Sequence, residues 1–381
     1  MPNLDRRTTL KIGAVAGLSL GLGFWKDALA SPAVVGAGPY GPLGDPDALG
    51  LRLPAGFSSR LLGVTGQEVP GTSFEWIGAP DGAATFATGE GGWIYSANSE
   101  LGSGTGGVAS IAFSAAGAIT DAYRILGGTT RNCSGGATPW GTWLSGEEIA
   151  SGHVWECDPA GVGAGVERPA LGTFSHEAAV VDSRTGFVYL TEDDPAGRLY
   201  RFKPTVAGDL SAGTLQAAKV RPDNTVRWVT VSADEPARDA RTTAFNRTEG
   251  AWFSGKFVYF CTTGDNKVWA LNARTRALEV IYDAAVLGNN APLKKPDGIT
   301  VHAPSRDLFV AEGGDDLQVM WIGRHRKQRT VAPFAQLVGH TGSEVTGLAF
   351  TPDGTRLIGS SQRGTDGNGV TFEITGPFRS K

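Results

Sequence analysis

The feature of this sequence that most constrains its fold is a pattern that recurs six times along the chain. Each copy has a short apolar strand that opens with an acidic residue or a cysteine, and a second strand that ends with a polar residue roughly fifteen residues later. The opening residues are Asp81, Cys133, Glu177, Glu249, Asp297 and Glu344, and the closing residues are Glu100, Glu147, Glu192, Asp265, Glu312 and Gln362. Repeats of about 45 to 70 residues, made of short strands between Gly, Pro and Asp turns, are typical of propeller blades. The pattern therefore predicts an all-β fold, a six-bladed β-propeller.

The composition agrees with a turn-rich β protein. The chain of 381 residues contains 55 glycines and only 2 methionines, and no sustained helical periodicity follows the N-terminus. Because a closed propeller is one unit, we expect a single domain over residues 57–381, preceded by an extended lead-in at 31–56. The segment 205–246 is longer than a blade connection, and we expect it to form either an outer-strand extension or a lid. The net charge of −4 and the absence of a Lys/Arg run argue against nucleic acid as a partner.

Residues 1–30 have the features of an export signal. Twin arginines, Arg6 and Arg7, precede an apolar stretch at 12–24 that is short for a membrane span, and Ala-Leu-Ala at 28–30 matches a cleavage site. The prediction is a twin-arginine signal peptide, with the twin-arginine export machinery as a partner and a periplasmic or secreted protein as the product. No stable membrane insertion is expected after cleavage. A general secretory signal with a coincidental arginine pair, or a retained anchor, are the alternatives.

The three cysteines do not form the framework of a disulfide-rich protein, because their number is odd and they are spread over a large domain. Cys157 and Cys261 lie in strand patterns and are interpreted as small buried apolar residues. Cys133 stands where the other repeats have a carboxylate. It is interpreted as a metal thiolate, with burial as the alternative.

The repeats predict a metal site at the centre of the ring. The inner strand of every blade runs beside the central channel, so residues at the same end of these strands converge in one funnel. Carboxylates and a thiolate crowded there would repel one another unless cations are bound. Oxygen ligands suit calcium, and a thiolate suits a transition ion such as iron. Asp81 has a simpler interpretation as a turn residue, whereas glutamate is a poor turn former, which favours Glu177, Glu249 and Glu344 as ligands.

Longer motifs resemble a known family. The matching segments run in order from Gly71 to Gly364 and include NSELGSGTGGVASIAF, RNCSGGATPWGTWLSGEE, LGTFSHEAAVVD, VYLTEDDPAGRLYRFKP, RTEGAWF and KPDGITV. They are similar to those of the PhoX-type alkaline phosphatases. The resemblance implies a six-bladed propeller whose funnel holds ferric iron (Fe3+) and calcium. It also implies hydrolysis of phosphomonoesters by a metal-bound oxygen, with no protein nucleophile.

The resemblance also implies roles for single residues. Arg247 matches an arginine that holds the phosphate, although a solvated loop arginine is the alternative, and Asn98 resembles an asparagine near that pocket. The implied metal ligands are Cys133, Glu177, Glu249, Asp297 and Glu344. The expected substrate is a small-molecule phosphate ester, and the expected oligomeric state is a monomer.

The chain departs from the family pattern at three places. It has Gly146-Glu147-Glu148 where Cys-Glu-Glu is frequent, Gln362-Arg363-Gly364 where Gln-His-Pro is common, and Gly313-Gly314 in place of an Asp-Gly pair. These differences concern the calcium ligands and the outer pocket. Two other functions remain open on the sequence: another calcium-dependent propeller hydrolase, of the lactonase or phosphotriesterase type, and a non-catalytic binding propeller.

Overall fold

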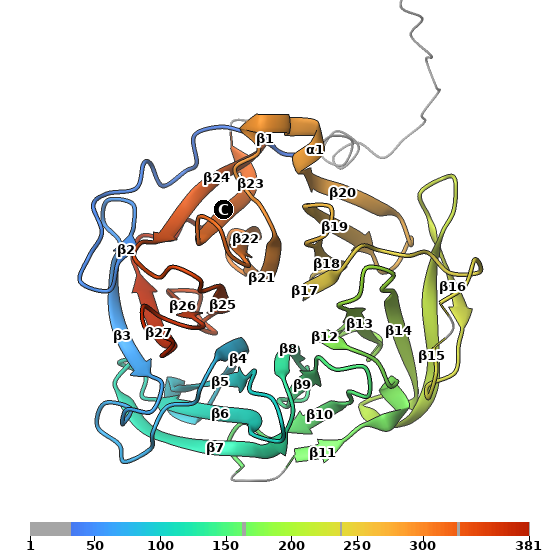
Figure 1. Cartoon of the computed structure of the whole chain (residues 1–381), viewed down its shortest axis with the longest axis horizontal. Coiled ribbons are helices and arrows are strands. Elements are labelled where there is room, and N and C mark those ends of the chain that lie inside the picture. Colours follow the sequence, from blue (N-terminus) through green and yellow to red (C-terminus); the bar gives the residue numbers. More distant parts are fainter. Residues whose placement is uncertain (1–31, 162–164, 237, 326–327, 381) are drawn as a thin grey trace, which may run out of the picture.

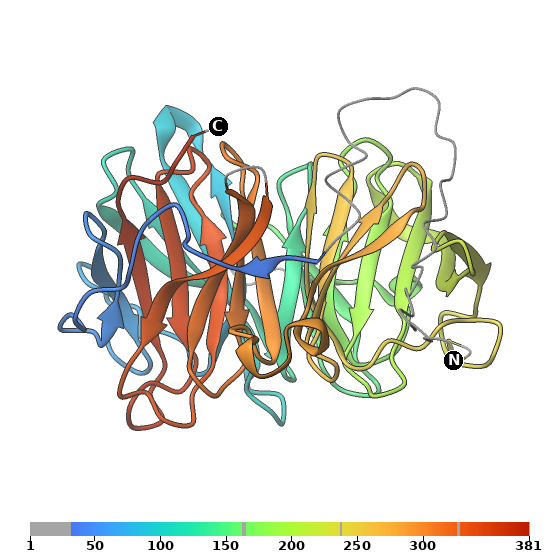
Figure 2. The ribbon, with the colours of Figure 1, turned by 90° about the horizontal axis from the view of Figure 1, so that it is seen from above.

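The chain forms a six-bladed β-propeller (Figure 1). The computed structural model describes residues 32–161, 165–236, 238–325 and 328–380. In these ranges the strands form six sheets around one axis, and they run along that axis between two faces made of loops (Figure 2). The predicted fold class is confirmed. The predicted signal peptide at 1–30 lies outside the described residues, and no helix within them is long and apolar enough to cross a membrane.

The two innermost strands of each blade position the candidate site. The inner strands of blades 1 to 6 are β4 (Pro80–Ala87), β8 (Asn132–Ala137), β12 (His176–Val181), β17 (Thr248–Ser254), β21 (Pro296–His302) and β25 (Val345–Phe350). The second strands are β5 (Trp93–Ser99), β9 (Trp143–Glu147), β13 (Val188–Glu192), β18 (Phe257–Thr262), β22 (Asp307–Glu312) and β26 (Arg356–Ser361).

The outer strands complete each blade. The third strands are β6 (Gly106–Phe113), β10 (Val154–Cys157), β14 (Leu199–Val206), β19 (Lys267–Asn272), β23 (Gln318–His325) and β27 (Val370–Thr375). The fourth strands are β7 (Ile119–Thr129), β11 (Gly165–Glu167), β15 (Asp209–Val220), β20 (Leu278–Asp283), β24 (Gln328–Leu337) and β3 (Ser58–Val64). Short helical segments are α1 (Ala284–Leu287) and the 3-10 turns Gly89–Gly91, Pro169–Leu171 and Gly288–Asn290.

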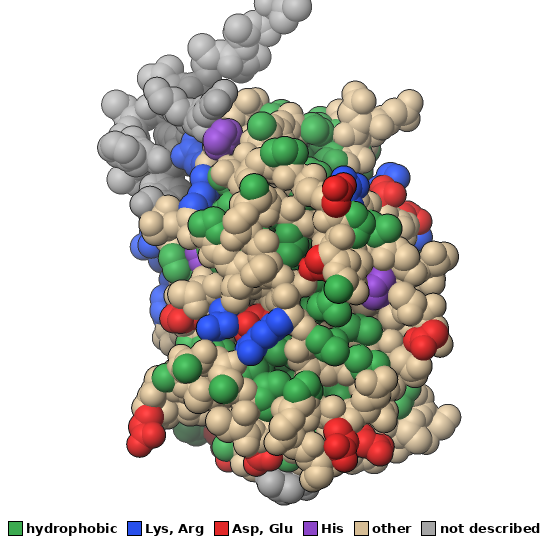
Figure 3. Space-filling view, turned by 90° about the vertical axis from the view of Figure 1, so that its left-hand side faces the viewer, with side chains coloured by type: hydrophobic (Ala, Val, Ile, Leu, Met, Phe, Trp, Pro, Cys, Tyr) green, Lys and Arg blue, Asp and Glu red, His purple; other side chains and the backbone are tan. Residues whose placement is uncertain are grey.

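The hydrophobic core lies between the blades and not on the axis. Buried apolar side chains of the described residues form six clusters, one at each contact between neighbouring blades. Between blades 5 and 6, for example, Phe309 and Trp321 pack with Phe350 and Phe372. On the outer side of the ring where β3 lies, small apolar patches alternate with polar and charged side chains (Figure 3). Burial between blades therefore stabilises the ring while its centre stays available for polar side chains.

The ring closes by pairing its two chain ends in one blade. β27 pairs antiparallel with β3, with Val370 opposite Val64 and Thr375 opposite Ser58. The lead-in contributes two short strands, β1 (Val34–Val35) and β2 (Leu51–Arg52), and both pair with β24 of blade 5. The lead-in is thus built into the edge of a neighbouring blade.

The long segment after blade 3's third strand extends that blade outward. β14 and β15 form a long hairpin, and β16 (Val226–Thr230) adds a fifth strand. The outer-strand alternative is therefore confirmed for this part of the segment. Its later part returns toward the inner strands, where Arg238 pairs with Glu192 and, at 3.1 Å, with Asp194.

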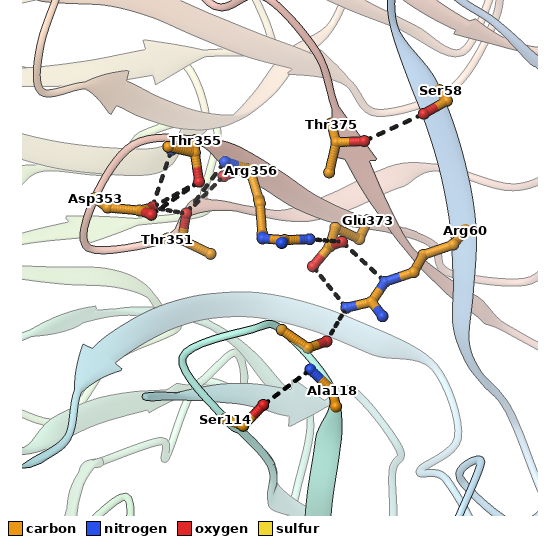
Figure 4. Close-up of polar contacts among 11 residues, drawn as sticks. Ser58, Arg60, Ser114, Ala118, Thr351, Asp353, Thr355, Arg356, Glu373 and Thr375 are labelled. Atoms are coloured by element: carbon orange, nitrogen blue, oxygen red, sulfur yellow. Dashed lines mark hydrogen bonds and ion pairs between the residues drawn. The ribbon is translucent and has the colours of Figure 1, made fainter. Parts of the chain in front are cut away.

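A buried carboxylate connects the closing blade with blade 1 (Figure 4). The side chain of Glu373 on β27 is 0% exposed and accepts hydrogen bonds from two arginines. Arg60 of β3 donates to both of its oxygens, at 2.8 and 3.0 Å, and Arg356 of β26 donates at 2.7 Å. Arg60 also donates to the carbonyl of Gly117 in blade 1, at 2.6 Å. This network joins β3, β26 and β27 of the closing blade to blade 1.

Replacing Glu373 with glutamine is expected to destabilise the ring. Glu373→Gln keeps the shape of the side chain but leaves two arginines without their anion, which should lower the free energy of unfolding by about 2 kcal/mol. Chemical denaturation measures the difference, and Glu235→Gln, an exposed glutamate, is the matched control. An equal stability of the two variants would show that the network does not hold the closure.

Candidate metal centre

A β-bulge turns the ligand-type residue of five inner strands toward the axis. In blade 1 the pairing of β4 with β5 shifts register between Pro80 and Ala83, and Asp81 lies inside this shift. An extra residue in one strand re-aims the side chain at the bulge, so this position repeats from blade to blade. The residues at this position are Asp81, Cys133, Glu177, Glu249 and Asp297.

Inner strands lie so close at this level that the next residue must be small. A Cβ atom on Gly82 would clash with the Cα of Ser134 in the neighbouring blade, and one on Gly250 would lie 2.7 Å from the carbonyl oxygen of Asp297. Glycine after the ligand therefore permits the approach that brings ligands of neighbouring blades together.

Blade 6 departs from this arrangement. Its register shift lies between Thr346 and Ala349, so the equivalent position is Gly347, whose φ is +63°. Glu344 comes three residues earlier, just before β25, and its Oε1 lies 2.8 Å from Nη1 of Arg363. Glu344 therefore stands nearer the mouth of the funnel than the other predicted ligands, with its side chain 30% exposed.

The ligand-type side chains form three overlapping groups, each with its candidate atoms within 4.8 Å of one another. Cys133 belongs to the first two groups and Glu177 to the last two, so both residues lie between neighbouring positions that a cation could occupy. Glu177 is 1% exposed, and its Oε2 has no hydrogen-bond partner among the described residues. The groups are Asp81, Glu100 and Cys133; Cys133, Glu148 and Glu177; and Glu177, Glu249 and Asp297.

Apart from Asp81, these residues line a cleft of about 240 Å³ in the funnel, which we call the funnel cleft. All five predicted metal ligands line it, and so does Arg247. The other lining residues are Glu100, Arg131, Glu148, Asp193, Thr263, Lys295, Gly313 and Arg363. Sequence reasoning had assigned no ligand role to Glu148 or Asp193.

The closing residues of the repeat have different roles. Glu147, Glu192 and Glu312 accept backbone N–H groups within their own blades. Glu147, for instance, accepts from Thr130 at 2.9 Å and from the indole of Trp155 at 3.1 Å. Glu100 does line the cleft. Nε2 of Gln362 donates to Oε2 of Glu100 at 2.7 Å.

Strand alternation explains why Glu148 and Asp193 were missed. Successive side chains of a strand point to opposite sides. Since Glu147 and Glu192 point into their blades, the residue after each one faces the funnel cleft. The adjacent acidic pairs Glu147-Glu148 and Glu192-Asp193 were the available signal, because neighbouring side chains at a strand end point in different directions.

Arg247 is held in place by carboxylates of the cleft. Its Nε and Nη2 donate to the two oxygens of Asp193 at 2.8 and 2.6 Å, and Nη2 lies 3.4 Å from Glu249. Its backbone is left-handed, with φ +57°, and its side chain is 46% exposed. Arg131 and Lys295 have the same conformation, at +50° and +43°, also two residues before a ligand-type residue. Such strain in a non-glycine residue is commonly retained at functional sites.

The structure does not bring Asn98 to the wall of the funnel cleft. Its amide is buried, and the nitrogen donates to the carbonyl oxygens of Cys133 and Ser134 at 3.1 and 2.9 Å. Its oxygen accepts from the indole of Trp143 at 2.8 Å. These contacts position the strand that carries Cys133, so a direct contact of Asn98 with a substrate remains only a prediction.

The sequence matches a known protein family. The sequence profile of the family described as Alkaline phosphatase PhoX matches residues 95–154 and 150–289, just over half of the chain. The chain belongs to the PhoX alkaline phosphatase family. The resemblance noted in the sequence is thereby confirmed.

Solved structures support the fold of this PhoX family member. Pseudomonas fluorescens PhoX, in complex with vanadate, matches with a TM-score of 0.69 and 16% identity over 91% of this chain and 98% of that one. A gluconolactonase from Xanthomonas campestris matches with a TM-score of 0.50 and 15% identity, over 89% and 99%. No curated protein matches the sequence. At these identities the two structures support the propeller fold alone.

Burial and crowding favour the protonated forms of the acidic side chains. Burial, together with neighbouring carboxylates, raises the pKa of Glu177 and of Glu249 well above the ordinary value for glutamate. Burial also raises the pKa of the Cys133 thiol, with Asp81 and Glu177 adding to the effect. A cation would reverse this preference, since ligands bind metals in their deprotonated forms.

The donor set of this PhoX family member fits cations. Carboxylate oxygens suit a hard ion such as calcium, and the thiol suits a transition ion. The unpartnered Oε2 of Glu177 is a buried oxygen for which the described residues offer no donor, as expected of an atom that would bind a metal. The PhoX fold thus holds a site able to bind metal ions.

Metal-free protein is expected to lose stability as the pH rises. Burial and neighbouring charges raise the pKa of Glu148 and of Asp297 to about 8, whereas unfolded carboxyls titrate near pH 4. The folded state therefore keeps protons that the unfolded state has released, and its advantage shrinks between about pH 4 and pH 8. In chelator, the unfolding temperature should fall across this range.

Added calcium should raise the unfolding temperature more at pH 8 than at pH 5, because it replaces the protons. Asp297→Asn should reduce the dependence on pH, since it removes one titrating group. An unfolding temperature in chelator that stays flat or rises with pH would contradict the proposed charge crowding.

Proposed function

We propose that this PhoX family member is an exported, metal-dependent phosphatase that hydrolyses phosphomonoesters. The observation that carries the proposal is the position of Arg247, fixed by Asp193, in the same small cleft as the overlapping ligand groups. That the related Pseudomonas fluorescens protein binds vanadate, a transition-state analogue, supports this reading of the cleft.

Arg247 would bind the phosphoryl group. A guanidinium presents a planar set of donors that matches two phosphoryl oxygens, and the charge that develops on these oxygens strengthens the contact in the transition state. Asp193 occupies Nε and one terminal nitrogen, which limits the rotation of the guanidinium. The contact to Glu249 keeps the group beside the ligand-type carboxylates. Pre-orientation of this kind reduces the cost of positioning the substrate.

The proposed cofactors are iron and calcium. Cys133 and Glu177 would hold iron, and Glu249, Asp297 and Glu344 would provide further carboxylate ligands, with Asp81, Glu100 and Glu148 added by the geometry. When bound, the cations would neutralise phosphoryl charge and activate the oxygen nucleophile.

The cellular setting is also a proposal. Export by the twin-arginine machinery to the periplasm or medium agrees with the arginine pair at the start of the sequence. A small-molecule phosphate ester is the proposed substrate, and the protein is proposed to act as a monomer. A lactonase-type or non-catalytic propeller would not require a thiol and an anchored arginine in one cleft, so both alternatives are less favoured.

Removing the Arg247 side chain should impair catalysis specifically. Arg247→Ala is expected to lower kcat/KM for p-nitrophenyl phosphate at alkaline pH by roughly 10²-fold. Chelation should abolish the activity of the unmodified protein, and metal addition should restore it. Arg274→Ala, an exposed arginine outside the funnel cleft, is the control. Retained activity in Arg247→Ala, or the absence of metal-dependent hydrolysis, would refute the proposal.

Iron retention should depend on one cysteine. Cys133→Ala is expected to lower bound iron by roughly tenfold or more while calcium binding changes less, because a thiolate selects the softer ion. Elemental analysis of purified protein measures both metals. Cys157→Ala, a buried cysteine between blades 1 and 2, is the matched control. Equal iron in the two variants would exclude Cys133 as an iron ligand.

A further inference from the structure

The residues just beyond the second strands differ in charge between the two halves of the funnel cleft. Directly after their second strands, blades 1, 2 and 3 present Glu100, Glu148 and Asp193, whereas blades 4 and 5 present the uncharged Thr263 and Gly313. The cations of blades 4, 5 and 6 are Arg247, Lys295 and Arg363.

Arg131 also lines the cleft, but its charge is paired with carboxylates of blades 1 and 2. It comes from blade 2, where it lies 2.6 Å from Glu100 and also pairs with Glu148, so its charge is offset within the acidic half. Neighbouring inner strands β17, β21 and β25 pack side by side (Figure 1). Arg247 precedes β17, Lys295 precedes β21 and Arg363 follows β26, and all three line the funnel cleft.

We propose that Lys295 and Arg363 form a second anion subsite beside Arg247. The substrates it favours are phosphomonoesters that carry another anionic group, either a carboxylate or a second phosphate. This inference rests on the proposed phosphatase function, because Arg247 is taken to bind the phosphate that is removed.

Buried hydrogen bonds fix the backbone of Arg363. Its N–H donates to Oγ of Ser343 at 2.9 Å. Ser343 lies 2.8 Å from Oγ of Ser361, which in turn lies 2.9 Å from Nδ1 of His340, and all three side chains are buried. Gly364 follows in a left-handed conformation, with φ +57°, where a Cβ would clash with the carbonyl of Asn368. The turn thus holds Arg363 in one place, as a binding residue requires.

The guanidinium of Arg363 is positioned to receive an anion. Among the described residues its recorded ion pair is the contact of Nη1 with Glu344, and the side chain remains 45% exposed. A guanidinium has five N–H donors, so the contact with one carboxylate leaves other donors available for a ligand.

Lys295 has an exposed ammonium group and a backbone held by a hydrogen bond. Its N–H donates to Oδ1 of Asn266 at 2.6 Å, and its backbone has φ +43°. Its ammonium lies 3.2 Å from Asp315, and both side chains are substantially exposed, at 52% and 42%. An exposed pair of this kind contributes little and is readily exchanged for a ligand anion. Thr263 and Gly313 add no carboxylate of their own, so the carboxylates on this side of the cleft are the ligand-type residues Glu249, Asp297 and Glu344.

The test compares ligands that differ only in a second anionic group. Propylphosphonate, 3-phosphonopropionate and propane-1,3-diphosphonate cannot be hydrolysed, and they carry no second anion, a carboxylate and a second phosphonate respectively. Calorimetry with the metal-loaded protein should show about tenfold tighter binding of one or both ligands with an anionic tail than of propylphosphonate. The ligand with the larger gain distinguishes the carboxylate class from the phosphate class.

Variants connect the preference to the two residues. Arg363→Gln and Lys295→Gln should each reduce the affinity ratio between the anionic and neutral ligands to about twofold, and Arg363→Lys should recover part of it. Arg274→Gln, outside the cleft, should leave the ratio unchanged. Metal content is measured for each variant, since Arg363 contacts Glu344.

Binding and turnover separate the two proposals. Equal affinities for all three phosphonates, or a preference that survives both charge-removing variants, would overturn the second subsite even if the protein hydrolyses phosphomonoesters. A charge-dependent preference without any hydrolysis would retain the subsite as an anion-binding site and refute the phosphatase function.

Discussion

Repulsion among acidic side chains buried around the axis is the constraint on which the site depends. Apolar packing stabilises the ring between its blades, so it does not fill the centre. The bulges of the inner strands instead direct carboxylates and one thiol inward, where burial favours their protonated forms. Positive charge must balance this arrangement. Arginines at the mouth provide part of this charge, and cations held by the donor set would provide the rest.

The repeated architecture permits blades of equal shape to carry unequal chemistry. A bulge at one level of the inner strand and a residue just beyond the second strand supply two positions per blade. Blades 1 to 3 use the second position for acids, and blades 4 and 5 do not. Blade 6 has Gly347 at the bulge, where the neighbouring strand leaves no space for a side chain, and contributes Glu344 from the preceding segment. The asymmetry of the site therefore arises from substitutions on a symmetrical frame.

The parts of the site that the sequence predicted are those set by local pattern. Glu177, Glu249 and Asp297 each open a short apolar strand, and the repeat alone brought them to one funnel. The sequence did not show that Glu148 and Asp193, and not Glu147 and Glu192, would line the funnel cleft. Which of two adjacent side chains faces the cleft depends on the register of the strands. Asn98 lies near the predicted ligand Cys133, but its amide groups are occupied by backbone carbonyls and Trp143.

The sequence by itself determined the class of fold, the number of blades and the family, because short strands, turns and repeated motifs are encoded locally. It also indicated that acidic residues and a cysteine would meet near the axis, since closure of a propeller arranges the inner strands that carry them around one channel. Only the tertiary structure decided which carboxylates share a cation position, how Arg247 is held by Asp193, and that Lys295 and Arg363 line the same cleft as Arg247. Those relations join residues of different blades, and their distances follow from bulges, register and interblade packing that no local pattern specifies.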